Sequence, residues 1–415
     1  MSDPQRRLRG GRPLWLPDTA RVPQRYPVLS GRHDTVVAIV GAGMTGALVA
    51  HAFASAGIST TVLEGAVIGS GSTAASSALL LKEPDRELTQ LTERYGARAS
   101  RRIWELSHQS VDQLVGLLKR LRIRCDLKTR DAVYYATTAQ AADRLRRECA
   151  LRVRFGFDAE WLGPAQIRRL TGIAAHGAIL SKSGAQFDPY RACVGIFRTA
   201  SSAGAHVFEQ SEVRRIEKAH NGVRIKTDQG TLHAERVVIA TGYATPQFRP
   251  LAGRFRMYRT YVLATEPIGR LQRADIDLSD VMVWDTERPY HYARWTPEHR
   301  LLLGGEDRLV KAGQQRRRQS LAAARDLRAY FVARLPALAT VRTERAWEGL
   351  FAMTADSLPY IGPHRRYPRH WFALGYGGNG MTFGFLAARL LLERWQGLKS
   401  RDHALFEFGR LRNTR

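Results

Sequence analysis

The sequence predicts an α/β fold with two domains, one of them Rossmann-like and the other α+β, built on a mainly antiparallel sheet. Three observations support this prediction. Residues 35–64 form a complete βαβ pattern, and residues 257–307 alternate short strand patterns with turns. At 415 residues, the chain is also long for one domain and suits two.

The βαβ unit contains a G-x-G-x-x-G motif between its first strand and its helix. Gly41 allows the tight turn, Gly43 lets backbone approach a pyrophosphate, and Gly46 lets the helix pack closely on the strand. The unit ends on Glu64, which is suited to accept a hydrogen bond from a ribose hydroxyl. The pattern predicts a site for an adenine dinucleotide and leaves NAD and FAD as alternatives.

The composition bounds the class of protein. Hydrophobic residues make up 44% of the chain, but no apolar run approaches the ~20 residues that a membrane helix needs. The net charge is +26, and the basic clusters alternate with acids and aliphatic residues as on solvated helix faces. We therefore expect no transmembrane segment, while an anionic partner such as nucleic acid stays open as a less favoured alternative.

The cysteines and the N-terminal residues bear on the cellular compartment of the protein. Cys125, Cys149 and Cys193 form no C-x-x-C pair and no metal-ligand spacing, so we predict no metal site and a reducing, cytoplasmic location. No apolar segment follows Arg6 and Arg7, which argues against an export signal. Residues 1–33 are expected to form a solvated basic arm.

Several further elements can be placed along the chain. We expect helices over 74–81, 86–124 and 139–155, and a strand over 131–137. Asp188 followed by Pro189 predicts the start of another helix, which should run to about residue 202.

Two later segments favour FAD over NAD. The buried strand Val237-Val238-Ile239-Ala240 ends in Thr241-Gly242, which brings a turn of small residues back toward the dinucleotide site. The glycine-rich turn at 375–382 places backbone amides at the start of the last helix, where they can stabilise negative charge on a reduced flavin. A nicotinamide dehydrogenase needs neither segment.

With these motifs the chain resembles the D-amino acid oxidase superfamily of FAD-dependent oxidoreductases, which includes glycine and sarcosine oxidases and D-amino acid dehydrogenases. The resemblance runs from residue 35 to about 395 and includes the segments GSGSTAASSALL, DPYR, YHYARW and WEGLFAMTADSLPYIG. It implies two interleaved domains. The FAD-binding domain would comprise 34–85, 186–252 and 345–398, the substrate domain 86–185 and 253–344, and 399–415 would form a C-terminal tail.

The resemblance also implies which residues bind the cofactor. The ADP half would contact the glycine motif and Glu64. Ser72, Thr73 and Ser76 would line the pyrophosphate and the flavin edge, and the backbone of Val213 would pair with adenine. The implied residues are Gly41, Gly43, Met44, Gly46, Glu64, Ser72, Thr73, Ser76, Val213, Thr241, Gly242, Gly377, Gly378, Asn379, Gly380 and Met381.

Departures from the family pattern bear on the substrate and the electron acceptor. Phe351 stands where glycine-oxidase-like members carry an arginine that binds the substrate carboxylate. No cysteine follows Cys193, so FAD is expected to bind non-covalently. The segment 304–307 offers no lysine of the kind that promotes the reaction with oxygen. The electron acceptor can therefore be O2 or a redox partner, and the enzyme can be an oxidase or a dehydrogenase.

The substrate-facing candidates come mainly from one strand. Alternation places Tyr290, Tyr292 and Arg294 on the same face, where Arg294 could hold a carboxylate through paired hydrogen bonds. Tyr258 and Asn379 complete the set of candidate catalytic residues. His291 points to the other face and is expected to be structural.

These observations predict an FAD-dependent oxidoreductase that oxidises the C–N bond of an amine or amino acid by hydride transfer to flavin, giving an imine that hydrolyses. Two alternatives stay open. One is a flavoenzyme that modifies tRNA, which the positive charge would suit. The other is a non-catalytic, flavin-bound component of a larger assembly.

Overall fold

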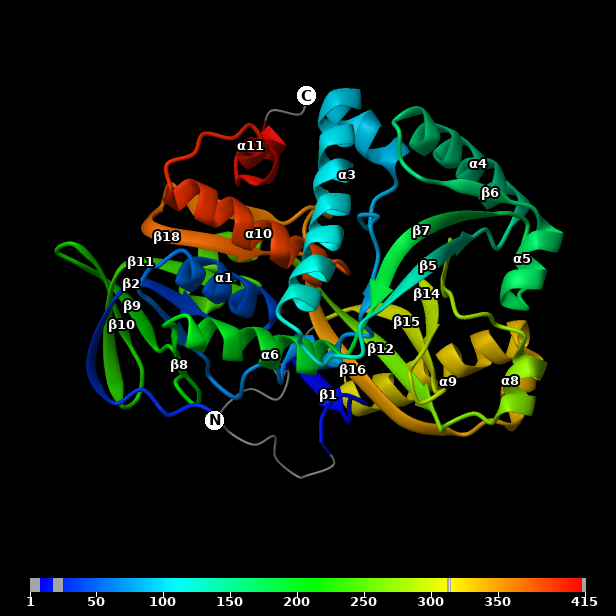
Figure 1. The fold of residues 1–415 in the computed structure, drawn as a ribbon, viewed down its shortest axis with the longest axis horizontal. Coiled ribbons are helices and arrows are strands. Elements are labelled where there is room, and N and C mark those ends of the chain that lie inside the picture. Colours follow the sequence, from blue (N-terminus) through cyan, green and yellow to red (C-terminus); the bar gives the residue numbers. More distant parts are fainter. Residues whose placement is uncertain (1–7, 18–24, 312, 314, 413–415) are drawn as a thin grey trace.

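The computed structural model describes residues 8–17, 25–311, 313 and 315–412. Two large β-sheets lie side by side, and the long helix α3 (Leu88–Arg120) stands at their junction (Figure 1). The chain passes between the two sheets several times, so each sheet is assembled from segments that are far apart in the sequence.

One sheet has eight strands among the described residues and carries the βαβ unit. Its main path runs β17-β18-β11-β2-β3-β8, with β10 and β9 extending from β11. The pairings among β18, β11, β2, β3 and β8 are parallel. The bounds are β2 (Gly31–Val40), β3 (Thr60–Leu63), β8 (His206–Phe208), β9 (Arg215–Ala219), β10 (Gly222–Lys226), β11 (Gly230–Gly242), β17 (Tyr360–His364) and β18 (Tyr367–Leu374).

Both faces of the central part of this sheet are buried, which explains why β3 and the later residues of β2, β11 and β18 are apolar. Val37 and Ile39 of β2 face a core that they share with α1 (Met44–Ser55), α6 (Pro189–Ser202) and α10 (Gly380–Trp395). The side chain between them, Ala38, belongs to a second core on the opposite face. The three helices lie together on one side of the sheet (Figure 1).

The other sheet has ten strands among the described residues and is mainly antiparallel. Its path runs β1-β16-β12-β15-β14-β13-β5-β7-β4, and β6 pairs with β7. Only the pairing of β13 with β5 is parallel among its described pairings. The bounds are β1 (Arg9–Gly11), β4 (Leu79–Leu80), β5 (Lys128–Tyr135), β6 (Glu160–Leu162), β7 (Ala178–Gln186), β12 (Arg256–Thr265), β13 (Met282–Asp285), β14 (His291–Trp295), β15 (Leu301–Leu309) and β16 (Thr343–Met353).

The remaining helices cover the outer face and the ends of the ten-stranded sheet or extend the dinucleotide-binding part. They are α2 (Ser72–Ala75), α4 (Ala139–Arg154), α5 (Pro164–Thr171), α7 (Arg249–Ala252), α8 (Arg270–Ile276), α9 (Arg316–Arg334) and α11 (Asp402–Phe406). None of the helices within the described ranges has the length and apolar character that crossing a membrane requires.

The predicted fold class is confirmed, and several element boundaries match closely. The helix expected from Pro189 runs to Ser202, and the Asp188 carboxylate caps it by accepting a hydrogen bond from the Arg191 amide at 2.9 Å. The helix expected over 74–81 is wrong. Helix α2 already ends at Ala75, and the chain then becomes extended and forms β4, because Leu79 and Leu80 pair with β7.

The N-terminal arm also differs from the expectation of a solvated segment. Within its described residues, β1 adds a strand beside β16, and the Trp15 indole donates to the Ser76 carbonyl at 2.7 Å. The domain boundary expected at residue 345 falls inside β16, which belongs to the antiparallel sheet.

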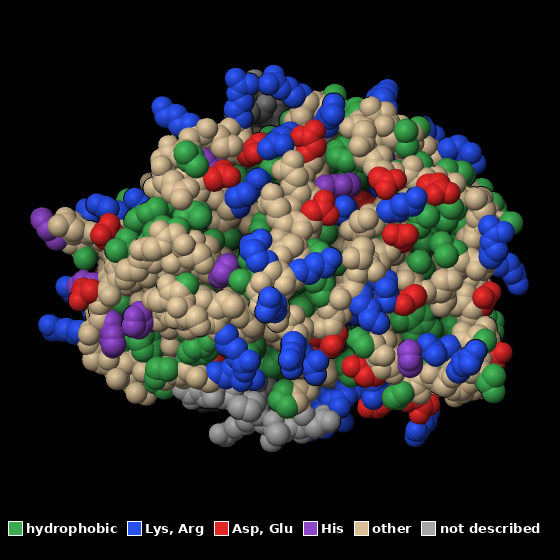
Figure 2. All heavy atoms as spheres, viewed as in Figure 1, with side chains coloured by type: hydrophobic (Ala, Val, Ile, Leu, Met, Phe, Trp, Pro, Cys, Tyr) green, Lys and Arg blue, Asp and Glu red, His purple; other side chains and the backbone are tan. Residues whose placement is uncertain are grey.

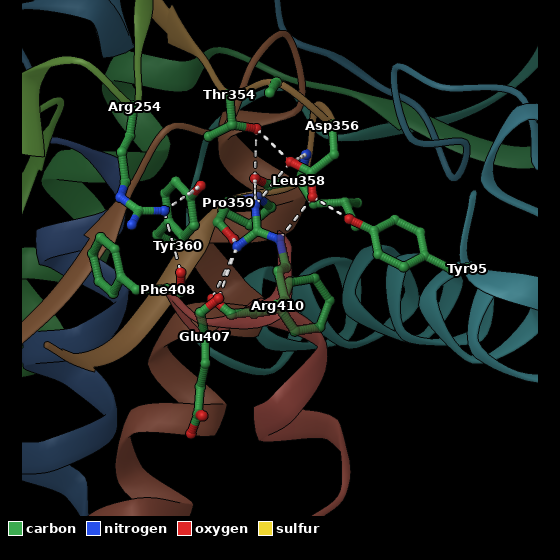
Figure 3. Close-up of polar contacts among 12 residues, drawn as sticks. Tyr95, Arg254, Thr354, Asp356, Leu358, Pro359, Tyr360, Glu407, Phe408 and Arg410 are labelled. Atoms are coloured by element: carbon green, nitrogen blue, oxygen red, sulfur yellow. Dashed lines mark hydrogen bonds and ion pairs between the residues drawn. The ribbon is translucent and has the colours of Figure 1, made fainter. Parts of the chain in front are cut away.

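A buried ion pair links the C-terminal segment to the loop at 354–359, between β16 and β17 (Figure 3). Arg410 donates to both carboxylate oxygens of Asp356, at 2.7 and 2.9 Å, and to the carbonyls of Leu358 and Pro359. The hydroxyl of Tyr95, from α3, donates to the same carboxylate. Burial alone would raise the pKa of Asp356, but the hydrogen bonds and charge of Arg410 outweigh it and lower the pKa to about 2.

Replacing Arg410 with Met should lower the free energy of unfolding by on the order of 3 kcal/mol, because it leaves a buried carboxylate without its partner. The measurement is urea denaturation of the FAD-loaded protein. Because the pKa of Asp356 is lowered in the folded chain, its stabilising contribution is present above the unfolded value of about 4 and is lost as the pH falls toward 2.

The exposed Arg214–Asp228 pair provides the control, since an Arg214→Met change removes an arginine whose ion pair is open to solvent. Equal stability of the two variants at neutral pH would contradict the role assigned to Arg410.

Candidate active site

Three segments that are distant in the sequence meet at the carboxyl ends of the parallel strands. Gly41 directly follows β2 and has a φ of 103°, and a Cβ there would lie 2.8 Å from the Ala240 carbonyl oxygen of β11. The Gly375 amide, which follows β18, donates to the Gly242 carbonyl at 2.9 Å. The glycine motif, the A-T-G turn and the GYGGNG turn therefore form one continuous edge of backbone.

Gly46 is the point of closest approach between α1 and the turn that precedes it. A Cβ at Gly46 would lie 2.0 Å from the carbonyl oxygen of Gly41, a distance that no side chain tolerates. In contrast, a Cβ at Gly43 would meet only the Thr73 hydroxyl, at 3.1 Å. Gly46 thus fixes the helix on the strand, and Gly43 leaves the N-terminus of α1 accessible to a ligand.

Glu64 and Thr73 both accept hydrogen bonds from backbone amides near that helix N-terminus. The Glu64 carboxylate accepts from the amides of Ala42 and Ala66, at 2.8 and 2.9 Å, and burial raises its pKa. Each of its oxygens retains a second lone pair that can accept from a hydroxyl group. The Thr73 hydroxyl accepts from the Met44 amide at 2.9 Å, which places it at the first turn of α1.

At the N-terminus of α10, the Asp85 carboxylate packs against the backbone of Gly377 and Gly378. Its carboxylate accepts from the Gly378 amide at 2.7 Å and from the Asn379 side-chain amide at 2.9 Å. A Cβ at Gly377 would collide with this carboxylate, 2.1 Å from one oxygen. Burial raises the pKa of Asp85 to about 6, although the Gly378 hydrogen bond opposes the shift.

The other predicted cofactor residues lie along the same edge or on the loop above it. Ser72 donates to the Leu350 carbonyl at 2.7 Å, and the Ser76 hydroxyl accepts from the Ala78 amide at 3.0 Å. The Thr241 hydroxyl donates to the carbonyl of Tyr243, and the Val213 carbonyl accepts from Gln247. Gly380 and Met381 open α10.

One face of the antiparallel sheet is directed toward this edge, and it carries the predicted tyrosines. The Tyr292 ring lies over Gly304, where a Cβ would be 2.0 Å from the ring. The Tyr292 hydroxyl is 3.3 Å from the Thr260 hydroxyl, and the Tyr290 hydroxyl donates to the Asp85 carbonyl at 3.0 Å. Tyr290 therefore lies against the Asp85 segment that contacts the turn before α10, whereas Tyr292 packs on the neighbouring strands of its own sheet.

Arg294 shares the face of Tyr292 as predicted, but its guanidinium is engaged by backbone. It donates to the carbonyls of Ser77, Phe187 and Trp295, at 2.7, 3.1 and 3.3 Å. The Trp15 ring covers it at 5.1 Å, and burial lowers its pKa to about 9. In this arrangement Arg294 positions residues 77 and 187, and its use for a substrate carboxylate would require some of these contacts to change.

Two further residues considered in the sequence analysis, Tyr258 and His291, stack on aromatic neighbours. The Tyr258 ring stacks on Phe351, at 5.7 Å between centroids, so the position where an arginine was expected is apolar. His291 lies on the opposite face of β14, where it stacks on Tyr330 and contacts Asp285 at 2.9 Å. Its surroundings are those of a structural histidine.

Sequence reasoning missed two acids at this site, Asp85 and Asp307. Asp85 is held by the glycine-rich turn through contacts that span 293 and 294 positions of the chain, so no local motif could reveal it. Asp307 lies in the segment 304–307, which was considered only for the lysine that it lacks.

Comparison with known proteins identifies the family. Residues 37–394 match the family described as FAD dependent oxidoreductase (DAO), and the chain belongs to it. Gamma-glutamylputrescine oxidoreductase of Escherichia coli (strain K12) is 27% identical over 365 residues, which cover 87% of this chain and 83% of that protein. Glycine oxidase of Bacillus licheniformis is 26% identical over 362 residues, with 84% and 89% covered.

Solved structures agree on the fold. The crystal structure of glycine oxidase from Geobacillus kaustophilus superposes with a TM-score of 0.76 at 22% identity, covering 89% of this chain and 96% of that one. The prediction of an FAD-dependent amine or amino-acid oxidoreductase is confirmed at the level of the class, over the tRNA-modifying and non-catalytic alternatives.

The residues present fit FAD. Gly41 and Gly46 allow α1 to approach the end of β2 closely. Backbone amides at the N-terminus of α1 and the Glu64 carboxylate then lie near one another, as binding of the ADP moiety requires. The α10 N-terminus lies at the same edge and can stabilise negative charge.

Positive charge is dispersed over the face of the molecule shown in Figure 2. In Figure 2 lysine and arginine side chains are scattered across the visible face and interspersed with acids. A surface groove of about 820 Å³ is lined in part by arginines, but Arg102 within it is paired with Asp402 at 2.7 Å. The pattern is that of solvated helix faces, without one continuous basic stripe on this side.

A Gly46→Ala change should abolish FAD binding, because the new methyl group would push α1 away from the glycine turn. Gly116→Ala is the matched control, since Gly116 also lies in a helix but has open space around its Cβ position and should gain helix stability. The measurement is bound flavin per chain from visible absorption. Retention of full FAD content by Gly46→Ala would refute the packing argument.

Proposed function

We propose that this protein oxidises the C–N bond of a small amine or amino acid, giving an imine that hydrolyses to a carbonyl compound. One observation carries the proposal: the edge formed by the three small-residue turns lies against the sheet face that bears Tyr292. When bound, FAD supplies the hydride acceptor, and the protein supplies binding, orientation and electrostatics.

The chain's own residues would act mainly by positioning. Tyr290 and Tyr292 are rigid aromatic walls, since each phenol is fixed by a hydrogen-bonding neighbour. Arg294 fixes the loop at Ser77 from the sheet side, and the α10 N-terminus would favour negative charge that develops on the cofactor. Tyr258 and Asn379 remain candidate contacts with substrate and cofactor.

The absence of a cysteine after Cys193 supports non-covalent attachment of FAD. All three cysteines are free and buried, which supports a reducing, cytoplasmic location. The final electron acceptor is either O2 or a redox partner, and both remain compatible with the site.

The test is anaerobic mixing of the FAD-loaded protein with a panel of D- and L-amino acids, N-methyl amino acids, alkyl amines and polyamines. We expect bleaching of the flavin absorption by at least one class of amine. A flavin that no member of the panel reduces, in protein that binds FAD stoichiometrically, would contradict the proposal.

The same panel tests Arg294. If its guanidinium only fixes the loop, an Arg294→Lys variant should bind FAD less tightly or lose stability while discriminating equally between amines and amino acids. A selective loss of affinity for amino acids over matched amines would instead assign it to the substrate carboxylate.

A further inference from the structure

Asp307 is turned toward the substrate-facing side of the sheet by a bulge in β15. Leu302 and Gly304 face that side, so regular alternation would place residue 306 there as well. The register between β12 and β15 shifts at this point, and Gly305 and Glu306 have φ values of 143° and 55°. The shift moves residue 307 onto the face of Tyr292. Bulges next to active sites commonly redirect a side chain in this way.

The side chains on either side of Asp307 point to the opposite face. Glu306 contacts His291 at 3.4 Å, and Arg308 pairs with Asp326 of α9 at 3.0 Å. Both contacts lie on the α9 side of the sheet. Asp307 is therefore the acid of this segment that faces Thr260 and Tyr292.

The carboxylate of Asp307 is incompletely paired. It is hydrogen-bonded to Thr260, but its buried Oδ1 has no hydrogen-bond partner within the described parts of the chain. Its pKa is raised to about 7, mainly by burial; the charges of Asp85 and Glu306 add to the rise, and Thr260 and His291 oppose it. No lysine or arginine is among these groups.

This lack of a cationic partner needs an explanation in a chain with 64 lysines and arginines. A buried carboxylate oxygen without a partner is unfavourable, and a cation that binds beside it removes this cost. Asp85, the nearby acid, is already engaged by the Gly378 amide and by Asn379. The open position is therefore at Asp307.

We propose that Asp307 binds the protonated amino group of the substrate, which makes it the specificity-determining residue of this site. The inference rests on the proposed oxidation of an amine. The ligand class is an alkylammonium ion, whose positive charge would also lie near the Tyr292 ring, a surface that attracts cations. A carboxylate on the substrate is not required by this contact.

The same contact prepares the amine for oxidation. The ammonium N–H bond breaks, and the proton forms an O–H bond with the Asp307 carboxylate. The nitrogen keeps the electron pair, and the neutral amine can then support departure of a hydride from its α-carbon. A carboxyl group that titrates near neutral pH is suited to accept this proton.

Two probes test the contact without turnover because neither has a hydrogen on the α-carbon. They are tert-butylamine, which is only a cation, and 2-aminoisobutyric acid, which adds a carboxylate. Binding to the FAD-loaded protein is measured by calorimetry and by the change in the flavin spectrum. We expect the wild-type protein to bind tert-butylamine in preference to neutral tert-butanol, and Asp307→Asn to weaken both amine probes by at least about tenfold.

Glu306→Gln is the matched control, because it removes a neighbouring acid that points to the other face, and it should leave both affinities within about twofold. The affinity of the wild-type protein for tert-butylamine should rise as the pH increases through about 7, when Asp307 ionises, and this rise should be absent in Asp307→Asn.

The proposal is overturned if the wild-type protein shows no preference for tert-butylamine over tert-butanol, or if Asp307→Asn binds the amine probes as tightly as Glu306→Gln. These outcomes leave the proposed oxidation standing if amines still bleach the flavin. Failure of every amine to reduce the flavin contradicts the proposed function instead, so the two failures can be distinguished.

Discussion

The contact on which the rest of the site depends is the approach of α1 to the turn at the end of β2. A Cβ at Gly46 would lie 2.0 Å from the Gly41 carbonyl oxygen, so the helix can occupy its place only because that side chain is absent. This approach places the N-terminus of α1 at the carboxyl edge of the parallel sheet. The A-T-G turn of β11 and the turn before α10 then align along the same edge because their strands are in register with β2.

A second set of contacts fixes the antiparallel sheet relative to this edge. Helix α2 lies between the two, and side chains from the sheet and from the segment after β1 bind the carbonyls of its last residue and of the residue that follows. The Trp347 indole donates to the Ala75 carbonyl at 2.9 Å, and the Trp15 indole donates to the Ser76 carbonyl at 2.7 Å. A sheet face anchored in this way can present Tyr292 and Asp307 at a constant distance from the cofactor edge, which hydride transfer requires.

The features that depend on a few neighbouring residues were predicted from the sequence. The glycines, the Asp188 cap and the apolar strands each follow from a few neighbouring residues, so their roles could be inferred from sequence alone. The helix expected over 74–81 was wrong because tertiary pairing of Leu79 and Leu80 with β7 overrides a helix-compatible composition. The N-terminal strand was missed for the same reason, since its partner β16 is more than 300 positions away.

The substrate side could be predicted only in part. Alternation correctly placed Tyr292 and Arg294 on one face, but it could not show that backbone carbonyls occupy the guanidinium. Nor could it show that a bulge places Asp307 on that face, because a bulge changes the phase of alternation without a clear sequence signal. The cofactor follows from motifs, whereas the substrate depends on a few side chains brought together by the fold.

The central chemical claim is that the α-carbon of an amine delivers a hydride to flavin held at this edge. The most direct measurement is the rate of anaerobic flavin reduction, in a single turnover, by an amine substrate and by the same amine deuterated at the α-carbon. The account predicts that deuteration slows flavin reduction severalfold. Equal rates for the two amines would contradict hydride transfer from that carbon as the step that limits flavin reduction.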